Sequence, residues 1–458
     1  MPVSYTKLWR ILLDKNMSRT ELKERARIST NVLARLGKGE PVSLESIEKI
    51  CRALSCDIGD IMEITAEPEK ADGGSGGAEK DEIEIYDGGY QGLRDIDWSF
   101  LNCRQDAISA LHPYPARFVE ELPKQLIESL GCPGGAAVFD PFCGSGTTLV
   151  EAQRAGIESV GVDLNPIACL ISRVKVQELD GNFLTSARQV VQAAETRYAE
   201  HYVSIPEIPN LDHWFKADIQ KALSAILMEI SQSGASPHAQ EALQFSLSSI
   251  IVRVSNQESD TRYAAVEKRV TAQDVFKSFY SACKKLALAK QETSFRVAAR
   301  VVQGDILTLS PESVGRRVGL VITSPPYPNA YEYWLYHKYR MWWLGYDPIS
   351  VRASEIGARP HYQKKNGQTE KDFERQMAQV FSLFDRVVVR GGHVCVVIGR
   401  SIIKGREIDN AALITGIAES RGYRPVAKIP REIASTRKSF NLSYGKITTE
   451  HIMIYRRG

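Results

Sequence analysis

The feature that most constrains the fold is an alternation of strand and helix signals in the C-terminal part of the chain. Short apolar runs at AAVFDPF (136–142), SVGVDLN (159–165) and VGLVIT (318–323) have the length and composition of buried strands. Helical patterns occur between and after them, at GTTLVEAQRAG (146–156) and FERQMAQVFSLFDRVV (373–388). This order predicts an α/β domain built on a doubly wound sheet.

The alternation fails between residues 171 and 300, where three long helical patterns predict a helical insertion. Another break is EPEKADGGSGGAEKDE (67–82), which is rich in glycine and charge and lacks apolar periodicity, as expected of a flexible linker. We therefore expect a small N-terminal domain over 1–66 and a linker over 67–85. A large domain would follow, formed by 86–170 and 301–458 with the insertion at 171–300 between them.

The N-terminal domain has the pattern of a small all-α unit made of short helices. Ser18 and Glu21 have the spacing of a capping box at the start of a second helix, and Ser29 precedes a third. Only about three residues join these two helices. Residues 1–38 contain nine Lys or Arg against three Asp or Glu, in a chain whose net charge is only +3. The domain is therefore locally basic, which favours contact with a polyanion.

This arrangement resembles the lambda-repressor-like helix-turn-helix family over about residues 1–64. The resemblance implies that the third helix lies in the major groove of DNA, where Thr30, Asn31 and Arg35 meet base edges and Lys38 lies near a phosphate. Such domains usually act on two half-sites, which implies a homodimer. The alternative is a small helical bundle used for dimerisation alone.

Cysteine usage and hydropathy narrow the class of protein. The eight cysteines are scattered, without a CxxC pair or a His/Cys cluster at zinc spacing, which argues against a structural metal and for a reduced compartment. No apolar run approaches the roughly 18 residues of a membrane-spanning helix, and the N-terminus lacks the apolar segment of a signal peptide. We therefore expect a cytoplasmic protein with no metal and no membrane partner.

A turn that contains glycine ends the first predicted strand of the large domain. In VFDPFCGSGTTLVEA (138–152), Gly144 and Gly146 lie between strand and helix, where backbone can approach a ligand closely. The spacing matches neither the dinucleotide fingerprint, which needs a third glycine, nor a P-loop, which needs a lysine. Asp163 ends the next strand and is placed either to bind both hydroxyls of a ribose or to cap the following helix. Asp305 ends a further strand and is placed to accept a hydrogen bond from an adenine amino group.

Three segments together resemble the S-adenosylmethionine-dependent amino-methyltransferases of DNA: HPYPARF (112–118), DPFCGSGTT (140–148) and TSPPY (323–327). The resemblance covers about residues 100–170 and 300–458, and it implies a class I methyltransferase sheet with a cofactor half at 86–170 and a catalytic half at 301–458. It implies S-adenosyl-L-methionine as cofactor. The residues implied to contact the cofactor are His112, Pro113, Ala116, Phe118, Asp140, Pro141, Phe142, Cys143, Gly144, Ser145, Gly146, Thr147, Thr148, Asp163, Asn165 and Asp305.

The resemblance also gives a chemical role to the Ser-Pro-Pro-Tyr turn that ends the strand at 318–323. The lone pair of an exocyclic amino group is delocalised into the base, so the nitrogen attacks well only when both N–H groups are held by acceptors. Ser324 Oγ and the carbonyl of Pro325 are the expected acceptors, because Pro325 and Pro326 fix the backbone. Tyr327 is expected to stack on the flipped base.

The first residue of the turn suggests which base is modified. Ser there is typical of cytosine-N4 enzymes, whereas Asp or Asn is typical of adenine-N6 enzymes, so we favour N4 of cytosine and keep N6 of adenine as the alternative. Two other readings stay open. One is a DNA-binding regulator with an inactive methyltransferase domain, and the other is an enzyme that methylates RNA or a protein glutamine.

Further contacts with double-stranded DNA are expected from polar, basic segments. The loops RASEIGARPHYQKK (352–365) and RKSFNLSYGK (437–446) and the polar stretch at 252–264 of the insertion are the candidates, although the insertion is equally well read as a scaffold. Their expected contact residues are Arg253, Arg352, Arg359, Arg437 and Lys438. These expectations describe a bacterial or phage-encoded, nucleoid-associated modification enzyme. A cognate restriction endonuclease is one expected partner, and the helix-turn-helix domain would serve autoregulation or tethering to DNA.

Overall fold

The structure of the protein is a computed structural model. It describes residues 3–14, 17, 19–37, 42–54, 56–64, 82–101, 103, 105–115, 117–260, 262–291, 297–329, 332–364, 366–432 and 449–458. The chain divides into two compact units, Met1–Lys80 and Asp81–Gly458, which are described separately below.

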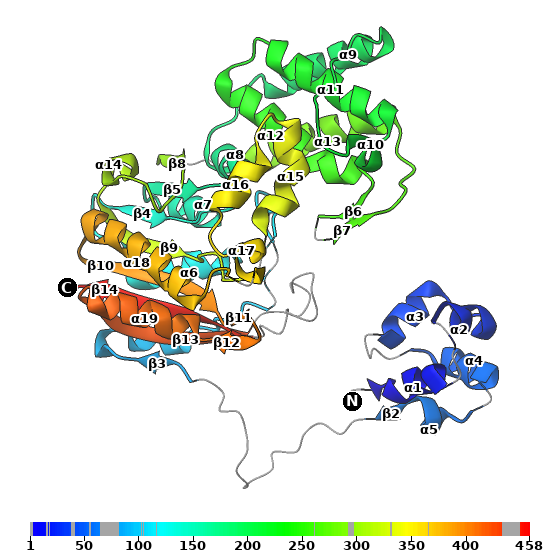
Figure 1. Cartoon of the computed structure of the whole chain (residues 1–458), viewed down its shortest axis with the longest axis horizontal. Helices are drawn as coiled ribbons and strands as arrows, with labels where there is room; N and C mark the ends of the chain where they lie inside the picture. Colours follow the sequence, from blue (N-terminus) through cyan, green and yellow to red (C-terminus); the bar gives the residue numbers. More distant parts are fainter. Residues whose placement is uncertain are drawn as a thin grey trace. The chain divides into compact units, whose positions relative to one another are not determined.

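The first unit is a bundle of short helices around a small apolar core (Figure 1). Its elements are β1 (Val3–Ser4), α1 (Thr6–Asp14), α2 (Arg19–Ala26), α3 (Thr30–Gly37), α4 (Leu44–Leu54), α5 (Ile58–Ile61) and β2 (Glu63–Ile64). The two helices predicted to begin after Ser18 and Ser29 are confirmed as α2 and α3. Leu8, Leu22, Ile50 and Ile61 are fully buried where these helices meet. The short pairing of β1 with β2, which closes the unit, carries no sequence signal of its own.

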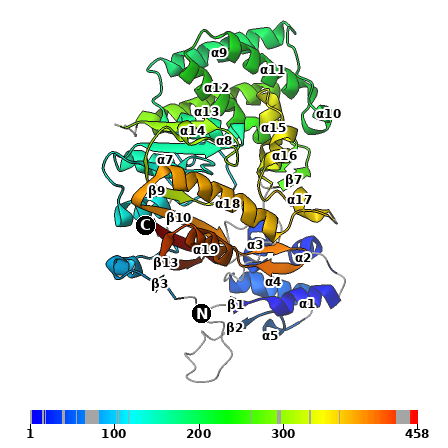
Figure 2. The same cartoon turned by 60° about the vertical axis from the view of Figure 1, so that its left-hand side comes forward.

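The second unit is built on an eight-stranded sheet in the order β3-β13-β14-β10-β9-β4-β5-β8 (Figures 1 and 2). The strands are β3 (Glu84–Ile85), β4 (Ala137–Asp140), β5 (Ser159–Asp163), β8 (Ala299–Gln303), β9 (Val318–Thr323), β10 (Val388–Gly399), β13 (Tyr423–Glu432) and β14 (Thr449–Arg457). The five strands from β10 to β8 are parallel, and β3, β13 and β14 pair antiparallel to their neighbours. The predicted α/β class is therefore confirmed.

The central strands are apolar on both faces because helices cover both. Val321 and Val396 face a core that contains α18 (Glu370–Val387) and α19 (Asn410–Ser420). Leu320 and Ile322, one position along the strand, face the opposite core, which contains α6 (Glu121–Leu130), part of α7 (Thr147–Arg154) and the 3-10 segment η1 (Gly88–Asp95). Side chains alternate between the faces of a strand, so continuous apolar runs are what a doubly covered sheet requires.

A second layer of helices lies beside the sheet and shares one core with α8 (Pro166–Val176). Its members between α8 and β8 are α9 (Phe183–Ala199), α10 (Leu211–Trp214), α11 (Ala217–Gln232), α12 (Pro237–Val254) and α13 (Ala272–Gln291), with the hairpin β6 (Gln257–Ser259) and β7 (Arg262–Ala265). Two helices from beyond β9, α15 (Tyr333–Trp343) and α16 (Pro348–Ser354), pack into the same core. The predicted helical character of this stretch is confirmed, but α12 and the hairpin were not expected.

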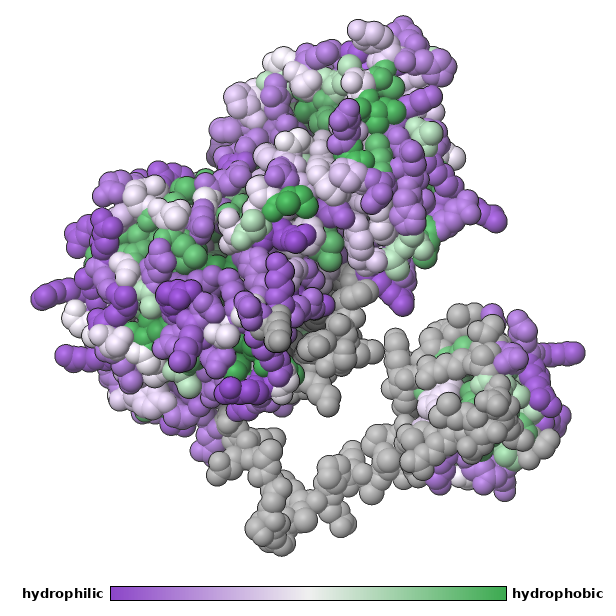
Figure 3. Space-filling view, in the orientation of Figure 1, coloured by the Kyte–Doolittle hydropathy of each residue, from purple (hydrophilic) through white to green (hydrophobic). Residues whose placement is uncertain are grey.

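The remaining elements are short connecting segments: α14 (Pro311–Val314), α17 (Arg359–Gln363), β11 (Ser401–Ile403) and β12 (Arg406–Ile408). On the face shown in Figure 3, hydrophilic side chains cover most of the second unit, and hydrophobic ones form separate small patches. Among the described residues, no helix has the length and apolarity needed to cross a bilayer.

Candidate active site

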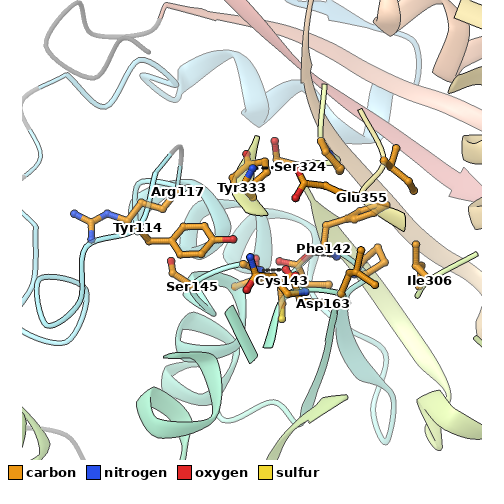
Figure 4. A pocket seen from close by; sticks show the side chains of 18 of the residues that line it. Tyr114, Arg117, Phe142, Cys143, Ser145, Asp163, Ile306, Ser324, Tyr333 and Glu355 are labelled. Carbon is orange, nitrogen blue, oxygen red and sulfur yellow. Dashed lines mark hydrogen bonds between the residues drawn. The ribbon is translucent and has the colours of Figure 1, made fainter. Parts of the chain in front are cut away.

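Four neighbouring parallel strands end at one pocket. The carboxyl ends of β4, β5, β8 and β9 carry Asp140, Asp163, Asp305 and Ser324, and all four residues line it. The pocket has a volume of about 890 Å³, part of which is open to solvent. In Figure 4, Ser324 and Glu355 lie on one side of the pocket, and Asp163 and Cys143 lie on the other. Ligands of open α/β sheets bind at this edge.

The loop after β4 is held against its neighbours by backbone hydrogen bonds. Gly144 donates its N–H to Asp163 Oδ2 over 2.9 Å, and its carbonyl accepts a hydrogen bond from Ser172 Oγ at 2.8 Å. Gly146 begins α7 with φ of 77°, and a Cβ atom there would lie 2.8 Å from Ser172 Oγ and 3.0 Å from its Cα. Since no side chain fits this approach, glycine at position 146 allows the start of α7 to pack directly against Ser172 of α8.

Two carboxyl groups of the pocket are partly withdrawn from water. Burial raises the pKa of both Asp140 and Asp163 to about 6. Asp140 accepts a hydrogen bond from Thr323 Oγ1 at 2.8 Å, which links the ends of β4 and β9. Asp163 Oδ1 accepts the N–H of Asn165 at 2.8 Å, and Asn165 caps α8 by accepting the N–H of Ile167. The capping role considered for this segment therefore belongs to Asn165, which also lines the pocket.

The segment at 112–118 supplies a wall of the pocket, although not with all the residues expected. Phe118 lines it as predicted, together with Tyr114 and Arg117, which were not predicted. The Tyr114 ring lies over Gly144, where a Cβ atom would meet it at 3.2 Å, and points into the pocket in Figure 4. Pro113 is not among the lining residues, and Ala116 lies outside the described residues.

His112 does not line the pocket, which corrects its predicted role as a cofactor contact. Its side chain is 1% exposed, and its Nε2 lies 3.0 Å from Ser248 Oγ of α12. Its ring also packs on Phe245 of the same helix, with 5.2 Å between centroids. His112 therefore joins the pocket wall to the helical layer. Burial lowers its pKa well below the ordinary value, so the imidazole is neutral.

The other expected cofactor residues lie where the loop after β4 and the strand ends meet the pocket. Those that line it are Asp140, Pro141, Phe142, Cys143, Gly144, Ser145, Thr147, Thr148, Asp163, Asn165 and Asp305, together with Phe118. Gly146 lies behind them at the start of α7 and is not among the lining residues.

The Ser-Pro-Pro-Tyr turn presents its polar end to the pocket and its aromatic end to the protein interior. Ser324 and Pro326 line the pocket, and Pro325 is buried between them. Tyr327 is only 7% exposed and does not line the pocket; its hydroxyl donates to Glu450 Oε1 at 2.9 Å. In this conformation Tyr327 therefore does not offer its ring to a base, which corrects the expected stacking role.

Glu355 and Tyr333 also line the pocket and were not among the predicted site residues. Glu355 is 6% exposed, and its carboxylate accepts the N–H groups of Tyr333 at 2.9 Å and Trp334 at 2.8 Å, at the start of α15. Burial raises its pKa to about 8. Tyr333 stacks on Tyr114, with 6.1 Å between the ring centroids. Glu355 lies in the segment expected to be a mobile loop, but α16 and α17 occupy much of that segment.

The residues expected to contact DNA are dispersed. Thr30, Asn31 and Arg35 lie on α3, with Arg35 exposed; Arg253 and Arg352 are exposed at the ends of α12 and α16, and Arg359 begins α17. Arg352 also lies over the ring of Trp334 at 5.3 Å. Lys38, Arg437 and Lys438 lie outside the described residues.

Within the polar stretch at 252–264, which was expected to contact DNA, Gln257 is not accessible to a base. Gln257 is 3% exposed, and its amide donates to Ser259 O within the β6–β7 hairpin. In the part of the chain that the structure describes, no group of three His, Cys, Asp or Glu side chains is placed to hold a metal ion.

Comparison with known families matches both units. Residues 7–67 match the family described as Cro/C1-type helix-turn-helix DNA-binding domain, and residues 66–173, which include the loop after β4, match the family described as DNA methylase. The chain is therefore similar to Cro/C1-type helix-turn-helix domains in its first unit and to DNA methylases around the loop after β4. DNA methylases of this family depend on S-adenosyl-L-methionine, the cofactor expected from the sequence.

Relatives of each unit are found among curated proteins. The chain is 39% identical over 77 residues to Type II methyltransferase M.MjaII of Methanocaldococcus jannaschii, which is 17% of this chain and 14% of that protein. It is 25% identical over 276 residues to Type II methyltransferase M.BsoBI of Geobacillus stearothermophilus, covering 52% and 53% of the two chains. The small unit is 39% identical over 61 residues to the uncharacterized HTH-type transcriptional regulator YozG of Bacillus subtilis, covering 13% of this chain and 73% of that one. The chain thus spans about half or less of the length of these methyltransferases.

Proposed function

We propose that this protein transfers a methyl group from S-adenosyl-L-methionine to an exocyclic amino group of a base in double-stranded DNA, with N4 of a flipped cytosine as the favoured target. The observation that carries the proposal is the shared pocket. The bare glycine loop after β4, the carboxylate that ends β5 and the Ser-Pro-Pro turn that ends β9 all open onto the same volume.

The pocket residues fit this cofactor. Gly144 lines the pocket without a side chain, so a ligand can approach its backbone closely, while Gly146 behind it leaves no space for a Cβ atom beside Ser172. Asp163 and Asp305 both line the pocket, where Asp163 would accept both hydroxyls of a ribose and Asp305 would accept an adenine amino group. When bound, the cofactor supplies an electrophilic methyl group on a sulfonium ion. Arg117, Tyr114 and Phe118 would hold its methionine part.

The chain's own residues would prepare the nitrogen that attacks. Ser324 Oγ and the carbonyl of Pro325 would each accept one amino N–H, which draws the nitrogen lone pair out of conjugation. The adjoining prolines fix φ near −65°, so the carbonyl needs no reorganisation. Enclosure by the aromatic and apolar wall would exclude water and hold the base in line with the methyl group.

The choice of base rests on Ser324. A hydroxyl in this position is typical of cytosine-N4 enzymes, and methylation of adenine N6 is the alternative outcome. The helix-turn-helix unit would bind either the operator of its own or a neighbouring gene, or a site that tethers the enzyme near its target. A cognate restriction endonuclease is the expected partner, in keeping with the names of the methyltransferases to which this chain is similar.

The proposal is tested by incubating purified protein and S-adenosyl-L-methionine with DNA, followed by mass spectrometry of the nucleosides. N4-methylcytosine that is absent with Ser324→Ala and with Asp163→Ala is the expected result. N6-methyladenine would keep the reaction class and overturn the assignment of the base. Absence of any methylated base on DNA of varied sequence, with methylation of RNA or none at all, would overturn the proposed function.

A further inference from the structure

The hydroxyl of Tyr327 is the centre of a short chain of hydrogen bonds behind the pocket. It donates to Glu450 Oε1 at 2.9 Å and lies 3.5 Å from Ser324 Oγ, the group that opens onto the pocket. The ring is 7% exposed and belongs to the apolar core beneath β9 and β10. The hydroxyl of Tyr327 is therefore linked to the pocket through Ser324 Oγ.

Glu450 is fixed by a second partner on its other oxygen. Oε2 accepts a hydrogen bond from Arg431 Nη1 at 3.3 Å, and the two side chains are only 17% and 9% exposed for Glu450 and Arg431. Arg431 lies near the end of β13 and Glu450 near the start of β14, which are adjacent antiparallel strands. A shielded, paired carboxylate with one oxygen committed to arginine is a strong acceptor for a phenol.

The chemistry of Glu450, Tyr327 and Ser324 determines which group donates and which accepts in each hydrogen bond. Burial, with the Glu450 carboxylate beside it, raises the pKa of Tyr327 well above its ordinary value, so the phenol keeps its proton. That proton goes to Glu450, because a carboxylate is the stronger acceptor and lies closer than Ser324. The phenol oxygen then has lone pairs free, and the hydroxyl hydrogen of Ser324 is its available donor.

We propose that Glu450, acting through Tyr327, positions the hydroxyl hydrogen of Ser324 away from the pocket, so that the lone pairs of Ser324 Oγ face the amino group to be methylated. A serine can donate as well as accept, whereas the proposed role requires acceptance only. The arrangement Glu450–Tyr327–Ser324 removes that ambiguity without moving any atom during the reaction. Glu450 and Tyr327 are positioning residues in this scheme, and the scheme rests on the proposed function.

The distance from Ser324 Oγ to Tyr327 Oη agrees with a bond that forms fully only in the complex. At 3.5 Å it exceeds the usual range for O–H···O, about 2.5 to 3.0 Å. Hydrogen bonds of active sites are often long in the free protein and tighten when substrate is bound. A base amino group that donates to Ser324 would strengthen the donation from Ser324 to Tyr327, because bonds in a chain polarise one another.

The test is a double-mutant cycle on the rate of methyl transfer in single-turnover experiments with the full chain. Tyr327→Phe, which keeps the ring, is expected to slow transfer about 10-fold, the effect of one hydrogen bond. In a Ser324→Ala background the same change is expected to slow it less than about 2-fold, because the hydroxyl to be positioned is gone. A structural role for the phenol would give the same loss in both backgrounds. That result, or an unchanged rate with Tyr327→Phe alone, overturns the proposal.

A matched control and a measurement without substrate complete the design. Tyr455→Phe removes another buried tyrosine hydroxyl, bonded to Thr415 Oγ1 at 2.9 Å far along β14, and should leave transfer unchanged. A second cycle, Tyr327→Phe with Glu450→Gln on the free energy of unfolding, must show coupling. Zero coupling in this second cycle would show that Tyr327 and Glu450 do not interact, and it would overturn the proposal whatever the substrate is. A wild-type protein that methylates no DNA but shows this coupling would overturn the proposed function while supporting the chain of hydrogen bonds.

Discussion

Two turns that flank the pocket, the glycine loop after β4 and the Ser-Pro-Pro-Tyr turn after the adjacent strand β9, are held in different ways. Gly144 is fixed by Asp163, 19 positions away, and by Ser172, 28 positions away. Tyr327 is fixed by Glu450, 123 positions away, and Asn329 donates to Ile402 O, 73 positions away. The two hydrogen bonds that fix Gly144 both lie within one β-α-β-α segment. The contacts that fix the second turn form only when β10 and the antiparallel strands β13 and β14 have joined the sheet.

This difference assigns separable tasks to the two turns. The glycine loop can preform a cofactor surface from local contacts, so damage there should appear in cofactor affinity. The catalytic turn contributes little surface but depends on distant partners, so damage there should appear in the rate of transfer.

The largest effect is expected from Ser324→Ala. Loss of one preorganised acceptor at the reacting nitrogen should lower the rate of methyl transfer roughly 100- to 1,000-fold. The dissociation constant of S-adenosyl-L-methionine should change less than about 2-fold, since Ser324 is not among the residues assigned to cofactor binding. Single-turnover kinetics and calorimetry measure the two quantities. Ser224→Ala, which removes a serine hydroxyl buried in α11, is the control and should alter neither. Equal losses of rate and cofactor affinity in Ser324→Ala would abolish the distinction between the turns.

Gly146→Ala should act in the opposite sense, on cofactor affinity more than on rate. A residue with a Cβ atom costs about 1 to 2 kcal/mol in the left-handed conformation, and here the Cβ atom would also meet Ser172 at 2.8 Å. We expect cofactor affinity to fall on the order of 10-fold as the loop shifts.

The chain offers a matched control for this change. Gly156 has φ of 72°, close to that of Gly146, but nothing lies within 4 Å of its added Cβ atom. Gly156→Ala should therefore lower the free energy of unfolding by about 1 kcal/mol and leave cofactor affinity unchanged. If both variants weakened the cofactor equally, the backbone conformation, and not the close approach to Ser172, would be responsible.

The same contrast explains how much of the site could be predicted from the sequence. The glycine loop, Asp163, Asp305 and Ser324 were found because each stands at the end of a recognisable strand, and parallel strand ends meet at one edge. The family motifs extended this to neighbours such as Phe118. Glu355 could not be found, because its role depends on the path of α15 and α16, which no local pattern records.

The roles predicted for His112 and Tyr327 were wrong for the same physical reason. His112 belongs to a recognisable motif, but its direction is set by Phe245 and Ser248 on α12. That helix has buried residues on every side, so it lacks the amphipathic pattern by which helices are found. Tyr327 points into the protein interior because its hydroxyl donates a hydrogen bond to Glu450 on β14. Sequence spacing does not reveal a partner that is so distant along the chain.

A smaller effect is expected from pH on cofactor affinity. Burial raises the pKa of Asp163 and Asp140 to about 6 in the free protein, and only the ionised carboxylate accepts two hydroxyls. Below pH 6 the cofactor must displace a proton, so its affinity should fall up to about 10-fold per pH unit for each carboxylate required, and be flat above pH 7. Calorimetry from pH 5 to pH 8 gives this slope, and Asp163→Asn should reduce it by one proton. An affinity that is equal at pH 5 and pH 7 would contradict the assignment of Asp163.

The smallest effect is expected from removal of the helix-turn-helix unit. The helix-turn-helix unit has an apolar core of its own, with buried residues from Tyr5 to Ile61, and the partners that fix the two turns all belong to the large unit. A chain that begins at Asp81 should methylate short duplexes within about 2-fold of the full chain, because distant sites without shared partners act independently. Binding to long DNA at low salt should weaken more, since the basic helices are lost. The contradicting outcome is a truncated chain that keeps its melting temperature but loses 10-fold or more in transfer rate on short duplexes. That result would show that the helix-turn-helix unit also supports the catalytic turn, so the division of tasks would extend across both units.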